Sequence, residues 1–277
     1  MIAEFLESWE LFSSPYISAL LIGVSLSLMG VVVVARGNVF VAAAVAQASM
    51  LGVALSLFIG VDLPVLFAVI CSVGASLLVE RKSENGGGST SEELTGWIFL
   101  ASGSLSVLLL ARMPYGLKEI QSLFSSSIIG AGTADIVVFG LLVVFFVGFL
   151  LLRLRRFTLY LSDPVMAAAV GANIFLWSTS IAVTLGLATG LAIRSSGMLY
   201  TFACLVLPAQ MAKNVCRDIP GMFFVAPLAA FGCVLLGLVF GNYFDLPPAQ
   251  TVVALMSGAL LLTWLFRWVR DAILPSP

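Results

Sequence analysis

The sequence contains no histidine and few charged residues of either sign. Lysine and arginine number 13 and aspartate and glutamate 14, so charged side chains make up 10% of the 277 residues, whereas soluble domains carry about 25%. Without histidine the chain cannot form a Ser-His-Asp triad, and it lacks the commonest metal ligand. Its net charge of −1 provides no basic surface, so nucleic acid is not an expected partner.

A nucleotide-binding loop is also missing. No glycine is followed by lysine, which excludes the G-x-x-x-x-G-K-[ST] pattern that holds ATP phosphates. The apolar segments contain no pair of acidic residues, which argues against an enzyme and against a carrier driven by protons or sodium. We therefore expect no catalytic residues and no cofactor in this chain. If it moves a solute uphill, the energy must come from another subunit.

Apolar residues dominate what remains. They make up 61% of the chain, and its mean hydropathy is +1.13. The apolar runs are continuous over about 17–22 residues, the length of a membrane-spanning helix, and do not alternate as barrel strands do. We predict one all-α domain over residues 1–277, a polytopic integral membrane bundle of eight or nine transmembrane helices. The nine apolar segments are residues 15–35, 39–60, 63–79, 94–111, 133–152, 174–193, 197–212, 221–241 and 249–266.

The positions of lysine and arginine predict the orientation of this bundle. If the N-terminus lies outside, ten of the 13 basic residues fall in cytoplasmic connections, as the positive-inside rule requires. We therefore predict the N-terminus outside and the C-terminus inside. The cytoplasmic set is Arg36, Arg81, Lys82, Arg153, Arg155, Arg156, Lys213, Arg217, Arg267 and Arg270, and the external set is Arg112, Lys118 and Arg194.

The longest hydrophilic connection is predicted as a flexible cytoplasmic loop near residues 81–93. Its middle, Asn85-Gly86-Gly87-Gly88-Ser89, has the glycine and serine composition of a linker.

Four motifs occur in the same order as in a known family and cover most of the chain. They are Val33–Phe40 followed by Ala46–Leu55, Gly116–Phe124 followed by Ser127–Ile129, Asp163–Gly171, and Gly197–Leu199 followed by Ala203–Ala209. On these motifs the chain resembles the permease subunits of zinc and manganese ABC importers. The resemblance implies a permease for a divalent ion of the zinc, manganese and iron class in a bacterial cell membrane. It also implies a separate cytoplasmic ATPase subunit that binds the ATP, a second permease copy or a paralogue, and an extracytoplasmic metal-binding protein.

The segment near residues 157–173 matches the short helix with which this family contacts its ATPase. The resemblance makes Asp163, Pro164, Ala167 and Gly171 candidates for coupling. Independently, Asp163 suits an N-cap, Pro164 the first helical position and Gly171 the end of a helix. A simple connection between two spans is the alternative.

The resemblance fails where the family places an Asp and a His four residues apart on its second helix. The matching positions here are Ala43 and Gln47. Alanine cannot bind a metal, and one amide oxygen is a weak ligand for zinc or manganese. Either the metal passes with little contact, or a second permease keeps the ligands, or the cargo differs.

Other residues are candidates for a transport pathway. Gln47 and Ser49 lie in the second span, and Gln210 follows Pro208 in the short seventh span. Pro208 is predicted to kink or end its helix, because proline removes a backbone hydrogen bond. For Gln47 and Pro208 the alternative is helix packing without a role in transport.

Two other functions stay open at this point. The chain could be the permease for a metal chelate such as a siderophore or cobalamin, for which missing metal ligands would be natural. It could also be an ATP-independent secondary carrier or a membrane scaffold. Copurification with a P-loop ATPase would separate these classes.

Overall fold

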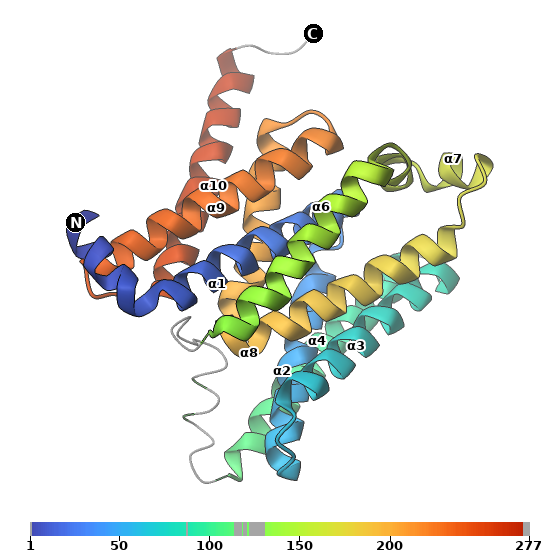
Figure 1. The fold of residues 1–277 in the computed structure, drawn as a ribbon. Coiled ribbons are helices and arrows are strands. Elements are labelled where there is room, and N and C mark those ends of the chain that lie inside the picture. Colours follow the sequence, from blue (N-terminus) through green and yellow to red (C-terminus); the bar gives the residue numbers. More distant parts are fainter. Residues whose placement is uncertain (1, 87, 114–117, 119–120, 122–130, 274–277) are drawn as a thin grey trace.

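The computed structural model describes residues 2–86, 88–113, 118, 121 and 131–273. Within these residues every regular element is a helix (Figure 1). The helices are α1 (Ile2–Ala35), α2 (Val39–Ile59), α3 (Pro64–Gly86), α4 (Gly88–Ala111), α6 (Thr133–Ser162), α7 (Pro164–Ala169), α8 (Ile174–Val215), α9 (Ile219–Tyr243) and α10 (Pro248–Ile273).

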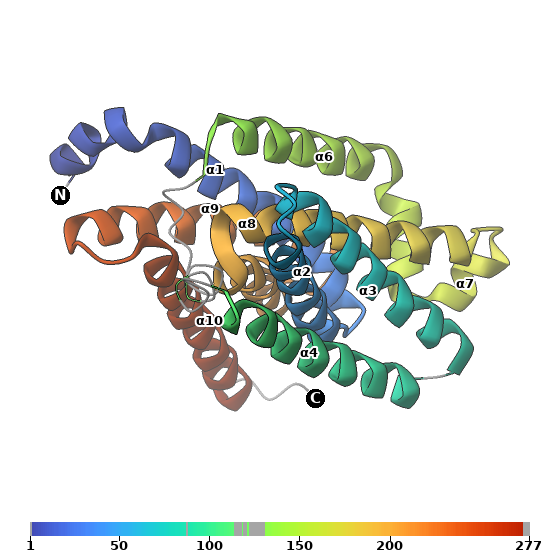
Figure 2. The same cartoon turned by 90° about the horizontal axis from the view of Figure 1, so that it is seen from below.

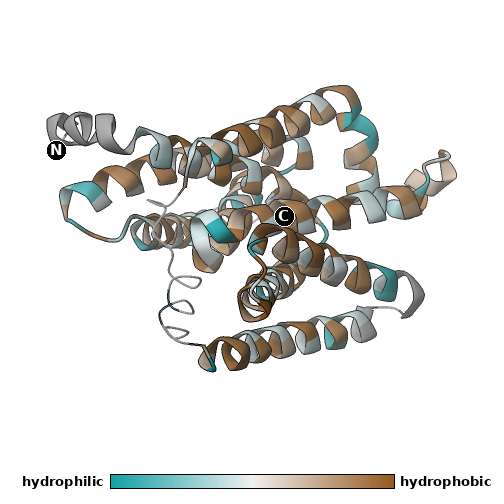
Figure 3. Cartoon of the chain, turned by 60° about the horizontal axis from the view of Figure 1, so that its bottom comes forward, coloured by the Kyte–Doolittle hydropathy of each residue, from teal (hydrophilic) through white to brown (hydrophobic). Residues whose placement is uncertain are grey.

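Eight of the described helices are long and apolar enough to cross a membrane, and α7, with six residues, is the exception. Hydrophobic residues cover most of the helix lengths, while hydrophilic residues gather mainly near helix ends and connections (Figure 3). This distribution suits a bundle whose middle lies in lipid, where each helix satisfies its own backbone groups. The predicted all-α membrane bundle of eight or nine spans is confirmed.

Helix α8 contains a break at Gly197. This glycine has φ 73° and ψ 167°, a conformation that other residues rarely adopt. A straight helix of 42 residues would be about 63 Å long, roughly twice the thickness of the hydrocarbon core of a bilayer. We call residues 174–196 the first arm of α8 and residues 198–215 the second arm.

The first arm runs antiparallel to α3. Near its start, Ser178 contacts Glu80 at the end of α3, with an oxygen–oxygen distance of 2.7 Å. Further along, Gly186 lies against Ser72, whose hydroxyl donates to its carbonyl oxygen at 2.7 Å. Because Arg36, which follows α1, binds Glu80, α1 and α3 end at the same face of the bundle, which we call the Arg36 end.

The second arm runs parallel to α1, toward the Arg36 end. The Tyr200 hydroxyl donates to the carbonyl oxygen of Ala19 at 2.9 Å, and Leu205 lies against Gly30. The chain therefore reverses direction at Gly197. The predicted separation of the sixth apolar segment from the seventh is confirmed by this reversal.

Close approach between α1 and the second arm depends on Gly30. A Cβ atom there would lie 1.7 Å from the carbonyl oxygen of Leu205, so no larger residue fits without a backbone shift. Small residues allow such helix contacts in membranes, where van der Waals packing replaces the hydrophobic driving force.

Burial separates central helices from peripheral ones. In the apolar window of α1 78% of the residues are buried, and in that of α2 67%, against 11% in α6. Helix α6 lies along the outside of the bundle, beside α1 (Figure 2). Its apolar outer face is therefore available to lipid.

The secondary structure differs from the prediction of a flexible loop near residues 81–93. Helix α3 continues to Gly86 and α4 begins at Gly88, so the described residues of this segment are helical. Glutamate, arginine and lysine are good helix formers, and they extend both helices beyond the apolar spans. For the same reason α6 continues past residue 152 to Ser162.

Candidate functional site

Ala43 and Gln47 lie one turn apart on α2, and both are buried. The side-chain oxygen of Gln47 faces α4, where a Cβ at Gly103 would lie 3.3 Å from it. Among the described residues this oxygen has no hydrogen-bond partner, which is unusual for a buried carbonyl group. The structure thus places Gln47 in the contact between α2 and α4.

Ser49 is fully buried, and its hydroxyl also has no partner among the described residues. It lies two positions after Gln47, which on a helix is a rotation of about 200°. The two side chains therefore leave α2 on nearly opposite faces, and the structure does not bring them to one surface.

Pro208 and Gln210 lie in the second arm of α8, Pro208 buried and Gln210 half-buried. Pro208 does not end its helix, because α8 continues through it to Val215 and the break lies at Gly197. Packed membrane helices tolerate proline where neighbouring groups compensate for the lost hydrogen bond.

The reversal at Gly197 is held by hydrogen bonds from nearby serine and threonine side chains. The Thr201 hydroxyl donates to the carbonyl oxygen of Gly197 at 2.7 Å, and the Ser196 hydroxyl donates to that of Ala192 at 2.9 Å. Ser195 donates to the carboxylate of Asp135 at 2.6 Å, and this carboxylate also accepts from the backbone N–H of Gly132 at 2.9 Å. Asp135 thereby ties the start of α6 to the reversal, a role that the sequence analysis missed.

The coupling segment forms a capped helix, as its residues predict. One carboxylate oxygen of Asp163 accepts from the backbone N–H groups of Val165 and Met166, both at 3.0 Å. Pro164 occupies the first helical position, and Gly171 follows the helix with φ 84°. These three positions confirm the predicted local geometry of α7.

Helix α7 has one buried and one exposed apolar side. Ala167 is buried in the main core, while Val165, Met166 and Val170 are 80%, 55% and 73% exposed. An isolated apolar side chain on a surface is ordinary, but two on this short capped helix and one directly after it form a patch suited to a protein contact.

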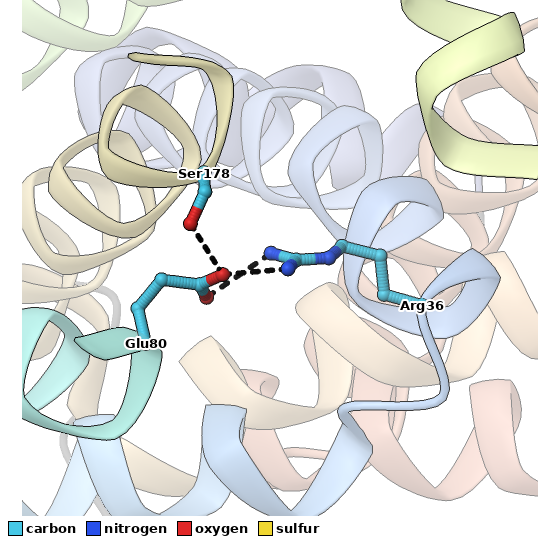
Figure 4. A network of polar contacts seen from close by, with 3 residues as sticks. All are labelled: Arg36, Glu80 and Ser178. Atoms are coloured by element: carbon cyan, nitrogen blue, oxygen red, sulfur yellow. Dashed lines mark hydrogen bonds and ion pairs between the residues drawn. The ribbon is translucent and has the colours of Figure 1, made fainter. Parts of the chain in front are cut away.

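A polar network joins four helices beside this segment. Arg36 donates from its two terminal nitrogens to the two carboxylate oxygens of Glu80, at 2.6 and 3.1 Å. Ser178 in the first arm donates to the same carboxylate, so α1, α3 and α8 meet in one cluster (Figure 4). The Arg36 guanidinium also lies 5.9 Å from the ring centre of Tyr160 in α6. The sequence analysis placed Arg36 in a motif but gave it no partner.

None of these arrangements forms a metal site. The described residues include no group of three or more His, Cys, Asp or Glu side chains that could hold a metal ion. Of Ala43 and Gln47, the two residues matched to the family's ligand positions, only Gln47 has a side-chain oxygen.

Comparisons with known proteins decide the family. The pattern of the ABC 3 transport family matches residues 8–267. The chain belongs to this family. It is a multi-pass plasma-membrane permease, a transport subunit and not a catalytic one. A secondary carrier and a membrane scaffold are accordingly ruled out as its class.

Relatives match over nearly the whole chain. The manganese transport system membrane protein MntC of Halalkalibacterium halodurans is 23% identical over 94% of this chain and 88% of its own length. The manganese import system permease protein ScaB of Streptococcus gordonii is 26% identical over 96% of this chain and 95% of its own. A chain of the solved PsaBC complex of Streptococcus pneumoniae with Fab has the same fold, with a TM-score of 0.81, 20% identity and 95% of each chain covered.

Proposed function

We propose that the chain is the permease subunit of an importer for a divalent transition metal ion of the manganese, zinc and iron class, driven by a separate ATPase. Relatives that transport manganese support the cargo class. ATP would bind on the partner, because this chain has no phosphate-binding loop.

The observation that carries the proposal is α7. Its N-terminus is fixed by Asp163 and Pro164, and its side chains Val165 and Met166 are exposed. A short rigid helix that projects from a bundle can transmit a displacement from a docked subunit to the helices behind it. The buried Ala167 connects α7 to that bundle. Just before α7, Tyr160 at the end of α6 lies beside Arg36 of the Arg36–Glu80 pair.

The distribution of basic residues supports a cytoplasmic position for the Arg36 end. Arg153, Arg155 and Arg156 lie near the end of α6, which runs antiparallel to the first arm and so reaches the Arg36 end. Arg267 contacts Asn214, at the end of the second arm, and so lies at the same end. Arg194 lies near the last residues of the first arm, at the end of the bundle opposite to the Arg36 end. By the positive-inside rule this asymmetry supports a cytoplasmic position for α7, where an ATPase subunit could reach it.

The path for the cargo would involve a second permease. Ala43 and Gln47 together offer one weak oxygen ligand, and a metal ion selected by this chain alone would need more. Pairing with a paralogue that keeps the acidic residue and the histidine would supply them, and an extracytoplasmic metal-binding protein would deliver the ion. A metal chelate is the second candidate cargo, favoured by the absence of a ligand group in the described residues.

A pull-down of the tagged chain from detergent-solubilised membranes, with mass spectrometry of its partners, tests this proposal. Recovery of a P-loop ATPase and a second permease with an intact Asp/His pair is the expected result. If the tagged chain is recovered with an ATPase but with no permease other than copies of itself, a metal chelate is the favoured cargo. A test for manganese uptake into proteoliposomes would then separate the chelate from the free ion. Isolation of the chain alone, under conditions that preserve a known ABC complex, would overturn the proposal.

A further inference from the structure

An apolar cavity of about 370 Å³ lies between α1, α6 and the first arm of α8. Its walls are almost entirely hydrophobic, with Phe146, Phe149 and Phe157 from α6 facing Trp177 and Ile181 from the first arm. On α6 the lining extends from residue 145 to residue 157, a rise of about 18 Å along the helix. The cavity therefore follows α6 for about 18 Å of its length.

The cavity exists because α6 is held away from the first arm over part of its length. Phe149 and Phe157 contact Trp177 edge-on or tilted, with ring centres 5.7 and 5.5 Å apart. Beyond this aromatic contact, toward the middle of the membrane, the half-buried Thr184 and the exposed Ser180 line the opposite wall. Small side chains there leave space that α6 does not fill.

A second cavity, of about 240 Å³, adjoins the first at the Arg36 end. The two share Asn173 and Trp177 in their linings. Arg153 and Arg156 line the second cavity, and neither has an ion pair with any described residue. Among the described residues, no aspartate or glutamate lines either cavity. Within the described part of the chain, the apolar cavity thus opens onto two guanidinium groups that have no acidic partner.

We propose that the two cavities together bind one anionic phospholipid. An acyl chain fills the apolar cavity, and the phosphate lies between Arg153 and Arg156. Guanidinium groups bind phosphate through paired N–H donors, and basic pockets between membrane helices are a known form of lipid recognition. Trp177 lies where the two cavities meet, the position that tryptophan prefers at a membrane interface.

The apolar cavity favours a lipid over other anions. A free phosphate or an acidic protein segment would satisfy the arginines but would leave the apolar cavity without an occupant. A phospholipid has a charged group and a hydrocarbon chain in the required order, and its chain enters from the bilayer that surrounds α6. The site would set the position of α6 relative to the first arm, directly before the coupling segment.

The chain offers a matched control for the arginines. Arg155 lies on the same turn of α6 and is exposed like its neighbours, but it lines neither of these two cavities. The experiment compares the R153Q/R156Q variant with R155Q, each purified with its partner subunits and placed in nanodiscs of equal phosphatidylglycerol and phosphatidylcholine. Native mass spectrometry then counts the lipids that each complex retains.

The wild type and R155Q should each retain one phosphatidylglycerol per chain in preference to phosphatidylcholine. In R153Q/R156Q this preference should fall roughly tenfold to thirtyfold, the effect expected from losing two basic groups at a membrane surface. The Ser180→Phe variant, which enlarges an exposed side chain in the apolar wall, should retain neither lipid at this site.

Equal retention of phosphatidylglycerol by R153Q/R156Q and R155Q would overturn the proposal. So would loss of the ATPase from R153Q/R156Q with lipid retention unchanged, since the arginines would then bind a protein. The lipid count does not depend on the cargo or on transport, so its failure is distinct from failure of the proposed function.

Discussion

Arg36 and Glu80 form a two-fold hydrogen-bonded ion pair between residues 44 positions apart, with nitrogen–oxygen distances of 2.6 and 3.1 Å. Their side chains are 21% and 11% exposed, so water screens the pair only in part. Ser178 adds a third hydrogen bond to the same carboxylate. The cluster therefore fixes the ends of α1 and α3 relative to the start of α8, which follows the coupling segment.

Replacing Glu80 with glutamine should destabilise the bundle, because the half-buried guanidinium of Arg36 would lose the carboxylate that accepts two of its hydrogen bonds. The expected loss is about 1–3 kcal/mol of unfolding free energy, measured as a lower Tm in detergent. Glu93→Gln, at an exposed position of α4, is the control. The double variant R36Q/E80Q should recover part of the loss, because it removes both charges together. Equal Tm values for E80Q and E93Q would contradict a structural role for the pair.

Replacing Gly30 with alanine should also destabilise the bundle. The added Cβ would lie 1.7 Å from the carbonyl oxygen of Leu205, so α1 and the second arm must separate. Overpacking of this kind costs about 1–3 kcal/mol or more. Gly140→Ala on α6 is the matched control, because nothing lies within 4 Å of its Cβ position, and it should be neutral or stabilising by up to about 1 kcal/mol. Thermal unfolding in detergent compares the two, and similar Tm values would show that the α1–α8 contact is looser than described.

Much of this fold follows from sequence because lipid imposes a simple rule. A membrane span must be apolar and about 20 residues long, so the nine apolar segments give the spans and even the reversal near Gly197. Local rules also predicted α7, since capping by Asp163 and the position of Pro164 depend on residues only a few positions away. These features are recorded in contiguous stretches of sequence.

Other features depend on contacts between distant residues, which one sequence does not record. The Arg36–Glu80 pair joins residues 44 positions apart, and the sequence analysis gave Arg36 no partner. Pro208 was expected to kink or end its helix, but the helix continues through it, and the residue with non-helical backbone angles is Gly197. Gln47 was placed on α2, but its position against Gly103 of α4 required the packing of the two helices.

Removing the cap of α7 should uncouple ATP hydrolysis from transport, if the proposed docking role holds. Asp163→Ala removes two hydrogen bonds to backbone N–H groups, which costs a helix terminus about 0.5–2 kcal/mol. Transport per ATP hydrolysed should fall in proteoliposomes, or the ATPase should be lost on purification. Asp163→Asn retains an acceptor and should restore coupling.

The control for this variant is Asp218→Ala, which removes the corresponding cap from α9, a bond of 3.1 Å to the backbone N–H of Gly221. It should leave coupling near the wild-type level, because α9 lies outside the coupling segment. Full coupling in Asp163→Ala, or an equal loss in both variants, would contradict the specific role of α7.

Cysteine labelling can determine the orientation of the bundle. Cys216 follows the second arm at the Arg36 end and is half-buried, whereas Cys71, Cys204 and Cys233 lie within membrane helices. If that end is cytoplasmic, a membrane-impermeant maleimide should modify Cys216 only after right-side-out cells are permeabilised. A Cys216→Ser variant identifies the modified residue. Labelling of intact cells at the wild-type Cys216 would reverse the predicted orientation.

The pH dependence of this labelling has a definite sign. Partial burial, and secondarily the carboxylate of Asp218, raise the pKa of the Cys216 thiol above its ordinary value of 9.0. The thiolate is the reactive form, so the labelling rate should keep rising with pH beyond the point where an ordinary exposed thiol reaches its plateau. Asp218→Asn removes the nearby negative charge and should shift the rate profile toward lower pH. An unchanged profile in that variant would show that the carboxylate does not act on the thiol, and burial alone would then account for the raised pKa.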